Sequence, residues 1–139
     1  MDLVVNLFTS FGYFERDEDH ALVLLGIADT LRVGGWFAMD FLNADTVRRG
    51  LVAEEEQVLG GGRVRITREL SEAGRRVIKT IVVPDGRRFV ERVRLFQPEE
   101  LETMLDAAGL TVRARHGDYE GGPLRSGAPR TILLARRDG

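Results

Sequence analysis

The sequence contains no cysteine and only one lysine among its 139 residues. The absence of cysteine excludes disulfide bonds and thiolate metal sites, and it is typical of a protein in a reducing compartment such as the cytoplasm. Almost all of the positive charge is arginine, and the formal net charge of −2 offers no long-range attraction for nucleic acid. These absences indicate a cytoplasmic protein that does not bind nucleic acid.

The longest stretch without a charged residue is also short. Residues 3–14 are interrupted by polar residues and no basic segment precedes them, so they fit neither a membrane span nor a signal peptide. Apolar residues make up 43% of the chain and charged residues 30%, which suits one ordinary core rather than two. We therefore expect a single domain over residues 1–139 that makes no contact with a membrane.

Two segments near the N-terminus, residues 2–8 and 36–41, are apolar at most positions. Such continuous apolar runs are typical of strands in the middle of a parallel sheet, where both faces are buried. Between them, apolar residues recur at the spacing of one helical face, at Leu24, Ile27, Ala28 and Leu31. Residues 2–41 are therefore predicted to form a β-α-β unit with a right-handed crossover.

The middle of the chain has a different pattern. Between residues 63 and 96, three runs rich in valine, isoleucine and arginine are separated by turn-forming clusters at residues 71–74 and 84–86. This pattern predicts an antiparallel β-meander, inserted over residues 51–96. The three runs and their turns carry ten basic residues against four acidic ones. The excess either receives an anionic ligand or partner, or marks the solvent-facing side of the sheet.

The C-terminal part contains a further helix and two further strands. Residues 99–108 fit a helix, with Pro98 near its first turn and Gly109 as its stop signal. Residues 110–116 and 131–136 fit strands and are joined by a loop rich in glycine and proline. We expect these strands to form a terminal hairpin added to the parallel sheet.

Several short motifs follow one another along the chain. They are residues 2–14 (DLVVNLFTSFGYF), 31–40 (LRVGGWFAMD), 93–101 (VRLFQPEEL), 107–110 (AAGL), and the closing Gly117, Asp118 and Tyr119 with Pro129 and Arg130. In this order they resemble strands four and five, the last helix and the final hairpin of class I S-adenosylmethionine-dependent methyltransferases, in the small-molecule subgroup with an antiparallel insert after strand five. The resemblance implies an α/β fold, a partial Rossmann-like methyltransferase sheet (strands four to seven) with an antiparallel β-meander insert.

The resemblance also implies a truncated methyltransferase, because it begins at strand four. In the family, a glycine-rich turn after the first strand and an acidic residue ending the second strand bind the cofactor, and neither precedes residue 2 here. Residues 60–62 are three glycines, but they precede a meander strand, so we interpret them as a flexible turn. We expect the isolated chain to bind S-adenosylmethionine weakly or not at all.

By resemblance, the activity is S-adenosylmethionine-dependent methyl transfer to a small-molecule acceptor, in which the protein mostly aligns and desolvates the reactants. Asn6, Leu7 and Phe8 end strand four and are implied to line the methionine end of the cofactor. The alternative is that they belong to an ordinary core strand. Tyr13 either orients the acceptor with its hydroxyl, as a catalytic residue that also binds substrate, or is a buried aromatic anchor.

Four further residues are candidates for acceptor binding or catalysis. Asn43 follows strand five, at the edge where open α/β sheets bind ligands, and it either contacts the acceptor or caps the next helix. His116, Asp118 and Tyr119 form a histidine–carboxylate–tyrosine cluster. His116 can act as general base toward a phenol or a protonated amine, with Asp118 and Tyr119 contacting the acceptor. Alternatively, His116 is a surface residue at a strand end. The sequence suggests no metal site.

A non-catalytic role is the alternative function, in which the chain is a truncated relic that acts as a dimerisation or protein-binding module. Without the strands that flank it in the family, the segment of residues 2–8 becomes the edge of the sheet. It is apolar on both faces and carries no lysine or proline that would protect such an edge. We expect it to pair with a second copy, giving a homo-oligomer, or with a separate chain that supplies the missing N-terminal half.

Overall fold

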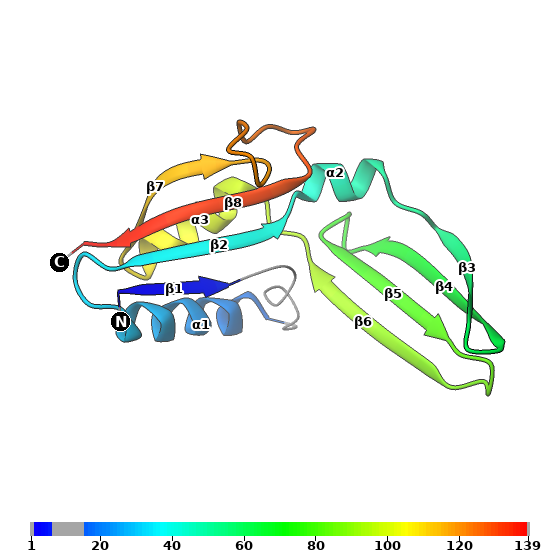
Figure 1. Cartoon of the computed structure of the whole chain (residues 1–139). Coiled ribbons are helices and arrows are strands. Elements are labelled where there is room, and N and C mark those ends of the chain that lie inside the picture. The colour runs from blue at the N-terminus through cyan, green and yellow to red at the C-terminus, as the bar shows by residue number, and fades with distance from the viewer. Residues whose placement is uncertain (1, 7–15, 139) are drawn as a thin grey trace.

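The structure, a computed structural model, describes residues 2–6 and 16–138. Within these ranges it contains two four-stranded sheets and three helices (Figure 1). The elements in chain order are β1 (Leu3–Asn6), α1 (Asp17–Thr30), β2 (Trp36–Leu42), α2 (Ala44–Arg49), β3 (Glu54–Leu59), β4 (Gly62–Ser71), β5 (Arg76–Val82), β6 (Arg88–Arg94), α3 (Pro98–Ala107), β7 (Leu110–His116) and β8 (Arg130–Arg137). None of these helices combines the length and the apolar character needed to cross a bilayer.

The first sheet has the strand order β1-β2-β8-β7. β1 and β2 are parallel, with Leu3 opposite Trp36, and α1 connects them. β8 runs antiparallel to β2, and β7 runs antiparallel to β8. This arrangement confirms both the predicted β-α-β unit and the predicted terminal hairpin.

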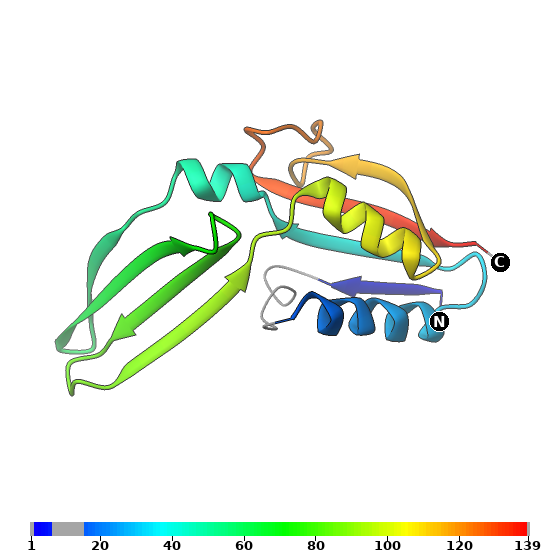
Figure 2. The ribbon, with the colours of Figure 1, turned by 180° about the vertical axis from the view of Figure 1, so that it is seen from behind.

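Helices α1 and α3 cover the same face of this sheet, and Figure 2 shows α3 lying across β2 and β8. The shared core consists of Leu24, Ala28, Leu31, Phe37, Met39, Phe41, Phe96, Leu101, Leu105, Leu110, Leu133 and Ala135. Because side chains alternate along a strand, the residues between these core positions point to the opposite face. None of the helices in the described ranges covers that face, where Leu3 is 57%, Val5 46% and Trp36 40% exposed. We call it the open face.

The second sheet is the predicted antiparallel meander, in the order β3-β4-β5-β6. The sequence predicted three strands from residue 63 onward, but the structure adds β3, which pairs with β4 along its whole length. Three consecutive glutamates at the start of β3 conceal the alternation that identifies a strand. Glu54 forms an ion pair with Arg65, and Glu55 Oε1 lies 2.9 Å from Arg68 Nη2, so arginines of β4 neutralise these charges across the strand pair.

Helix α3 begins immediately after the meander, at Pro98. The backbone N–H of Gln97 donates a hydrogen bond of 2.9 Å to Glu100 Oε1, which satisfies one of the free donors at the start of the helix. Burial tends to raise the pKa of Glu100, but the bond from Gln97 and the guanidinium of Arg94 outweigh it, and the pKa lies below its ordinary value. Glu100 is therefore an ionised partner for Arg94.

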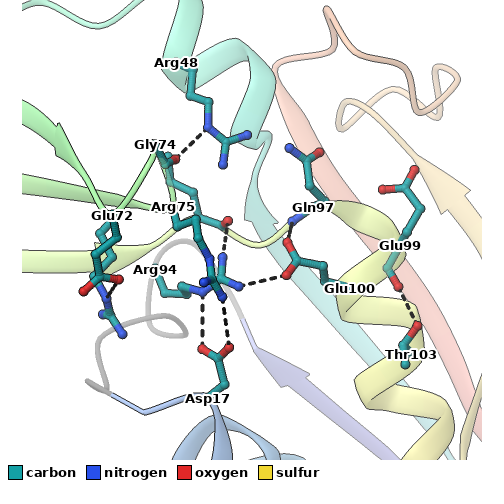
Figure 3. Close-up of polar contacts among 12 residues, drawn as sticks. Asp17, Arg48, Glu72, Gly74, Arg75, Arg94, Gln97, Glu99, Glu100 and Thr103 are labelled. Carbon is teal, nitrogen blue, oxygen red and sulfur yellow. Dashed lines mark hydrogen bonds and ion pairs between the residues drawn. The ribbon is translucent and has the colours of Figure 1, made fainter.

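Arg94, at the end of β6, joins the meander to the first sheet and its helices (Figure 3). Its side chain is only 2% exposed, with Nε 3.3 Å from Asp17 Oδ1 and Nη2 2.8 Å from Glu100 Oε2. Nη1 donates to the carbonyl oxygen of Leu95 at 2.8 Å, and the guanidinium carbon lies 4.5 Å from the ring centroid of Phe96. One buried cation thus ties the last meander strand to the first turns of α1 and α3.

Replacing Arg94 with methionine should lower the free energy of unfolding by about 2–3 kcal/mol. Glu100 loses its ion-pair partner and Asp17 keeps only Arg75, at 3.8 Å, while the apolar volume is kept. Breaking a fully buried pair costs more, but Asp17 and Glu100 remain partly exposed. Urea unfolding measures the change. The matched control is Arg92→Met, two residues earlier on the same strand, where the arginine is exposed. Equal unfolding midpoints for the two variants would show that the junction does not depend on Arg94.

Candidate functional site

The carboxyl ends of β1 and β2 lie at one edge of the first sheet, because the two strands are parallel. β7 ends and β8 begins at the same edge, with His116 opposite Ile132 and Arg130 opposite Leu42. Open α/β sheets bind their ligands at this edge. The fold therefore collects most of the predicted site residues there, namely Asn6, Asn43, His116, Asp118 and Tyr119. The predicted residues Leu7, Phe8 and Tyr13 lie outside the described residues.

The most closely connected polar group at this edge consists of Asp40, Tyr119 and Arg130. Asp40 is buried on β2, and its Oδ2 accepts a hydrogen bond of 2.5 Å from the Tyr119 hydroxyl. Arg130 Nε donates to Asp40 Oδ1 at 2.8 Å. Both oxygens of the buried carboxylate are thus satisfied, as burial of a charge in an apolar strand requires.

Tyr119 has an anchored hydroxyl and an accessible ring. The hydrogen bond to Asp40 raises the pKa of Tyr119 above its ordinary value, so the hydroxyl stays protonated and is not a base. The residue as a whole is 67% exposed. A ligand could therefore contact the face and edge of the Tyr119 ring, whose position is fixed by the bond from its hydroxyl to Asp40.

Asn43 has both ends of its amide engaged. It is buried, its Oδ1 accepts a hydrogen bond of 3.3 Å from the backbone N–H of Thr46, and Nδ2 donates to the carbonyl oxygen of Arg125 at 3.0 Å. Of the two interpretations from the sequence, the helix cap is confirmed. The contact with an acceptor stays a prediction.

His116 ends β7 and Asp118 lies in the loop that follows, but no hydrogen bond joins them in the described part of the chain. His116 Nδ1 lies 3.3 Å from the carbonyl oxygen of Gly121. The Asp118 carboxylate accepts backbone N–H bonds of 2.9 Å from Gly122 and from Glu120, and these bonds lower its pKa. Asp118 therefore shapes the loop, which places His116 and Tyr119 at its base.

Arg130 was not among the predicted site residues. The signal that could have identified it is Asp40, an acidic residue inside an otherwise apolar strand, because a buried carboxylate needs a cation or several donors. Which cation meets it is decided by the register of β2 with β8, a contact between residues 90 positions apart. Among the described residues, no histidine, aspartate and glutamate side chains gather in a group that could hold a metal ion.

Replacing Asp40 with asparagine should lower the pKa of Tyr119, because a neutral amide stabilises the protonated phenol less than a carboxylate does. The measurement is the absorbance of the phenolate during an alkaline titration. It needs a Tyr13→Phe background, because the chain has two tyrosines. Asp118→Asn is the control, since that carboxylate bonds to the backbone of its own loop. An unchanged titration midpoint in Asp40→Asn would contradict the hydrogen bond.

No protein-family model and no curated protein matches the sequence. Solved structures do match the fold. The CcbJ methyltransferase from Streptomyces caelestis matches with a TM-score of 0.78 and 18% identity, over 98% of this chain and 60% of that chain. An S-adenosylmethionine-dependent methyltransferase from Clostridium acetobutylicum matches with a TM-score of 0.81 and 17% identity, over 99% of this chain and 58% of that chain. The sugar N-methyltransferase KedS8 from a Streptoalloteichus species matches with a TM-score of 0.61 and 21% identity, over 99% and 56%.

These likenesses extend over almost all of this chain but over only part of each matched protein. The chain spans 60% of the first of them and 58% of the second. The parallel pair β1 and β2, the terminal hairpin and the antiparallel insert are all included in the match, because it covers nearly the whole chain. The protein therefore has the Rossmann-like fold of class I S-adenosylmethionine-dependent methyltransferases.

Proposed function

We propose that the protein serves in the transfer of a methyl group from S-adenosylmethionine to a small-molecule acceptor. The observation that carries this proposal is the fold match over nearly the whole chain to methyltransferases, which include a sugar N-methyltransferase. The polar group of Asp40, Tyr119 and Arg130 supports it, because it lies at the edge of the sheet where α/β folds bind ligands.

In this proposal the residues that follow β1 face the cofactor. When bound, S-adenosylmethionine supplies a sulfonium methyl group that a lone pair of the acceptor attacks. Asn6 ends β1 at the ligand-binding edge, and with Leu7 and Phe8 it would line the methionine end of the cofactor. The contribution of this wall is alignment and exclusion of water rather than chemistry.

The acceptor would lie against the loop between β7 and β8. His116 would take a proton from the acceptor, since a neutral imidazole is a competent base near neutral pH. Tyr119 would contact the acceptor through its ring, because its hydroxyl is bound to Asp40. Asp118 would act on the acceptor through the loop that it shapes, and Asn43 and Tyr13 complete the set of proposed acceptor contacts.

The cofactor needs groups beyond those that the described residues offer. The ribose of S-adenosylmethionine calls for a carboxylate that can accept hydrogen bonds from its hydroxyls. Asp40 is a carboxylate at the proposed edge, but Tyr119 and Arg130 already engage both of its oxygens. Asp40 is therefore not free to bind the ribose hydroxyls.

We expect the 139-residue chain to bind S-adenosylmethionine weakly or not at all in a calorimetric titration. Fusing it to the part of the Clostridium acetobutylicum methyltransferase that it does not match should restore binding. The folded fusion should then transfer a labelled methyl group to members of a panel of amino sugars, small amines and phenols. His116→Gln in the fusion should slow that transfer by about 100-fold or more without weakening cofactor binding.

Two possible results would contradict different parts of this prediction, namely the incomplete cofactor site and the acceptor class. Tight binding of S-adenosylmethionine by the chain alone would refute the expectation of an incomplete cofactor site. A fusion that folds cooperatively and binds the cofactor, yet methylates no member of the panel, would contradict the proposed acceptor class. The Clostridium segment without this chain is the control for both measurements.

Association with another polypeptide is a second candidate function, and the exposure of β1 favours it. Among the described strands β1 pairs only with β2, so the backbone groups along its other side have no strand partner. Leu3 is 57% and Val5 46% exposed on the open face of this strand. An apolar edge of this kind pairs readily with another strand, from a second copy or from a different chain.

Light scattering at high protein concentration should therefore find a species larger than one chain. Val5→Lys should shift it toward the monomer, because the substitution places a charge in the apolar seam. Val58→Lys is the control, since Val58 is exposed on β3 of the other sheet. A monodisperse monomer of the unmodified chain would rule out association through β1.

A further inference from the structure

A cavity of about 260 Å³ lies between helix α2 and the meander. Its apolar walls come from both sides. Leu42 ends β2, Val47 belongs to α2 and Leu51 follows α2, while Val77 and Val93 come from β5 and β6. Its charged residues are Arg68, Lys79 and Glu91. The cavity is smaller than the roughly 300–1,000 Å³ that hold drug-sized ligands, so it suits a small metabolite.

The three charged residues form one row across the meander. Arg68 of β4 lies opposite Lys79 of β5, and Lys79 lies opposite Glu91 of β6. Residues directly opposite on neighbouring strands project to the same face. The row therefore presents two adjacent cations and then an anion to the same cavity.

These charges differ in whether they are already paired. Arg68 Nη2 lies 2.9 Å from Glu55 Oε1 and is thus neutralised within the meander. Lys79 and Glu91, although opposite each other, form no ion pair in the part of the chain that the structure describes. An ammonium and a carboxylate thus stand side by side at the cavity, with Lys79 half-buried and Glu91 exposed to solvent.

The sum of the charges restricts the class of that ligand. Arg68 and Lys79 are balanced by Glu55 and Glu91, so the cavity is neutral as a whole. A simple anion would be attracted by Lys79 but repelled by Glu91, and a simple cation would meet the reverse. A zwitterion places a carboxylate at Lys79 and an ammonium at Glu91, and both contacts are charge-assisted hydrogen bonds.

We propose that this cavity binds a small zwitterion with an apolar side chain, an aliphatic α-amino acid. Its carboxylate contacts Lys79, its ammonium contacts Glu91, and its side chain packs against Leu42, Val47 and Val93. The assignment concerns binding alone and does not depend on methyl transfer.

Most of the charged residues that line two of the larger cavities already form ion pairs. One of about 440 Å³ includes Glu102 and Arg115, which bind each other. The other, of about 460 Å³, includes Asp17 and Glu100, which both bind Arg94. The 260 Å³ cavity also contains Lys79, the only lysine of the chain. The paired charges of the two larger cavities serve to hold the fold together.

Three matched ligands test the proposal on the unmodified chain by calorimetry or by NMR titration. They are L-leucine, 3-methylbutylamine, which lacks the carboxylate of leucine, and 4-methylpentanoate, which lacks its amino group. L-leucine should bind at least about tenfold more tightly than either analogue, because each charge-assisted contact contributes on that scale.

Two variants assign the contacts. Lys79→Met should reduce the affinity for L-leucine to that of 3-methylbutylamine and leave the amine unaffected. Glu91→Gln should reduce it to that of 4-methylpentanoate and leave the acid unaffected. Arg92→Gln, next to Glu91 but on the opposite face of β6, is the control and should bind L-leucine normally.

The proposal is overturned if L-leucine does not bind, or if it binds no more tightly than both analogues. It is also overturned if Lys79→Met and Glu91→Gln bind L-leucine as the unmodified chain does, with thermal unfolding verifying that each variant is folded. S-adenosylmethionine is not used in these titrations. Failure here therefore leaves the proposed methyl transfer standing, and failure of methyl transfer leaves this site standing.

Discussion

The arrangement of the whole chain depends on one buried cation, Arg94. Its guanidinium is surrounded by Asp17, Glu100, the Leu95 carbonyl and the Phe96 ring, so removal from water is compensated on every side. Leu95, Phe96 and Glu100 follow Arg94 closely, in the segment that leads into α3 and in its first turn, whereas Asp17 lies 77 positions away in the first turn of α1. A neutral side chain could fill the same space, but it could not hold two carboxylates from different helices toward one point. A second link reinforces the junction, because Arg48 of α2 donates to the Gly74 carbonyl in the turn between β4 and β5 at 2.7 Å (Figure 3).

The second constraint is that the first sheet buries only one of its faces. Phe37, Met39 and Phe41 of β2 pack beneath α1 and α3, while the residues between them point to the open face. The apolar exposure is not confined to the strand edge. Helix α1 lies beside β1 in both views of the molecule (Figures 1 and 2), and it exposes Leu22 and Leu25 as well. A helix with apolar residues on several sides is typical of a buried position. The exposed surface of α1 therefore adjoins that of β1, and a partner strand along β1 would lie close to both.

Much of the fold could be predicted from periodicity, and the failures have identifiable causes. Continuous apolar runs identified β1 and β2, although one face of each strand is partly exposed. Glycine and proline marked the turns of the meander. β3 was missed because three consecutive glutamates resemble a polar linker, and their ion pairs with Arg65 and Arg68 on β4 are visible only in the structure. The site was harder to predict, because its polar residues depend on tertiary contacts. Asn43 could be assigned two roles from sequence, and only the position of Thr46 selected the cap. Tyr119 was identified as a candidate, but its bond to Asp40 spans 79 positions and follows from the register of the final hairpin.

The polar group of Asp40, Tyr119 and Arg130 also has one unsatisfied member. Arg130 Nη2 is buried and makes no hydrogen bond to the described residues, although Nε of the same side chain is bound to Asp40. A buried donor without an acceptor costs about 1–3 kcal/mol, so natural structures rarely keep one. Arg130 lies opposite Leu42 and points, like Asp40, to the open face, where Leu3, Val5 and Trp36 are exposed. The unmet hydrogen bond and the uncovered apolar surface therefore lie on the same side of the same sheet. An element that packs on this face would cover the apolar side chains, whereas a strand added at the edge alone would satisfy only the backbone of β1.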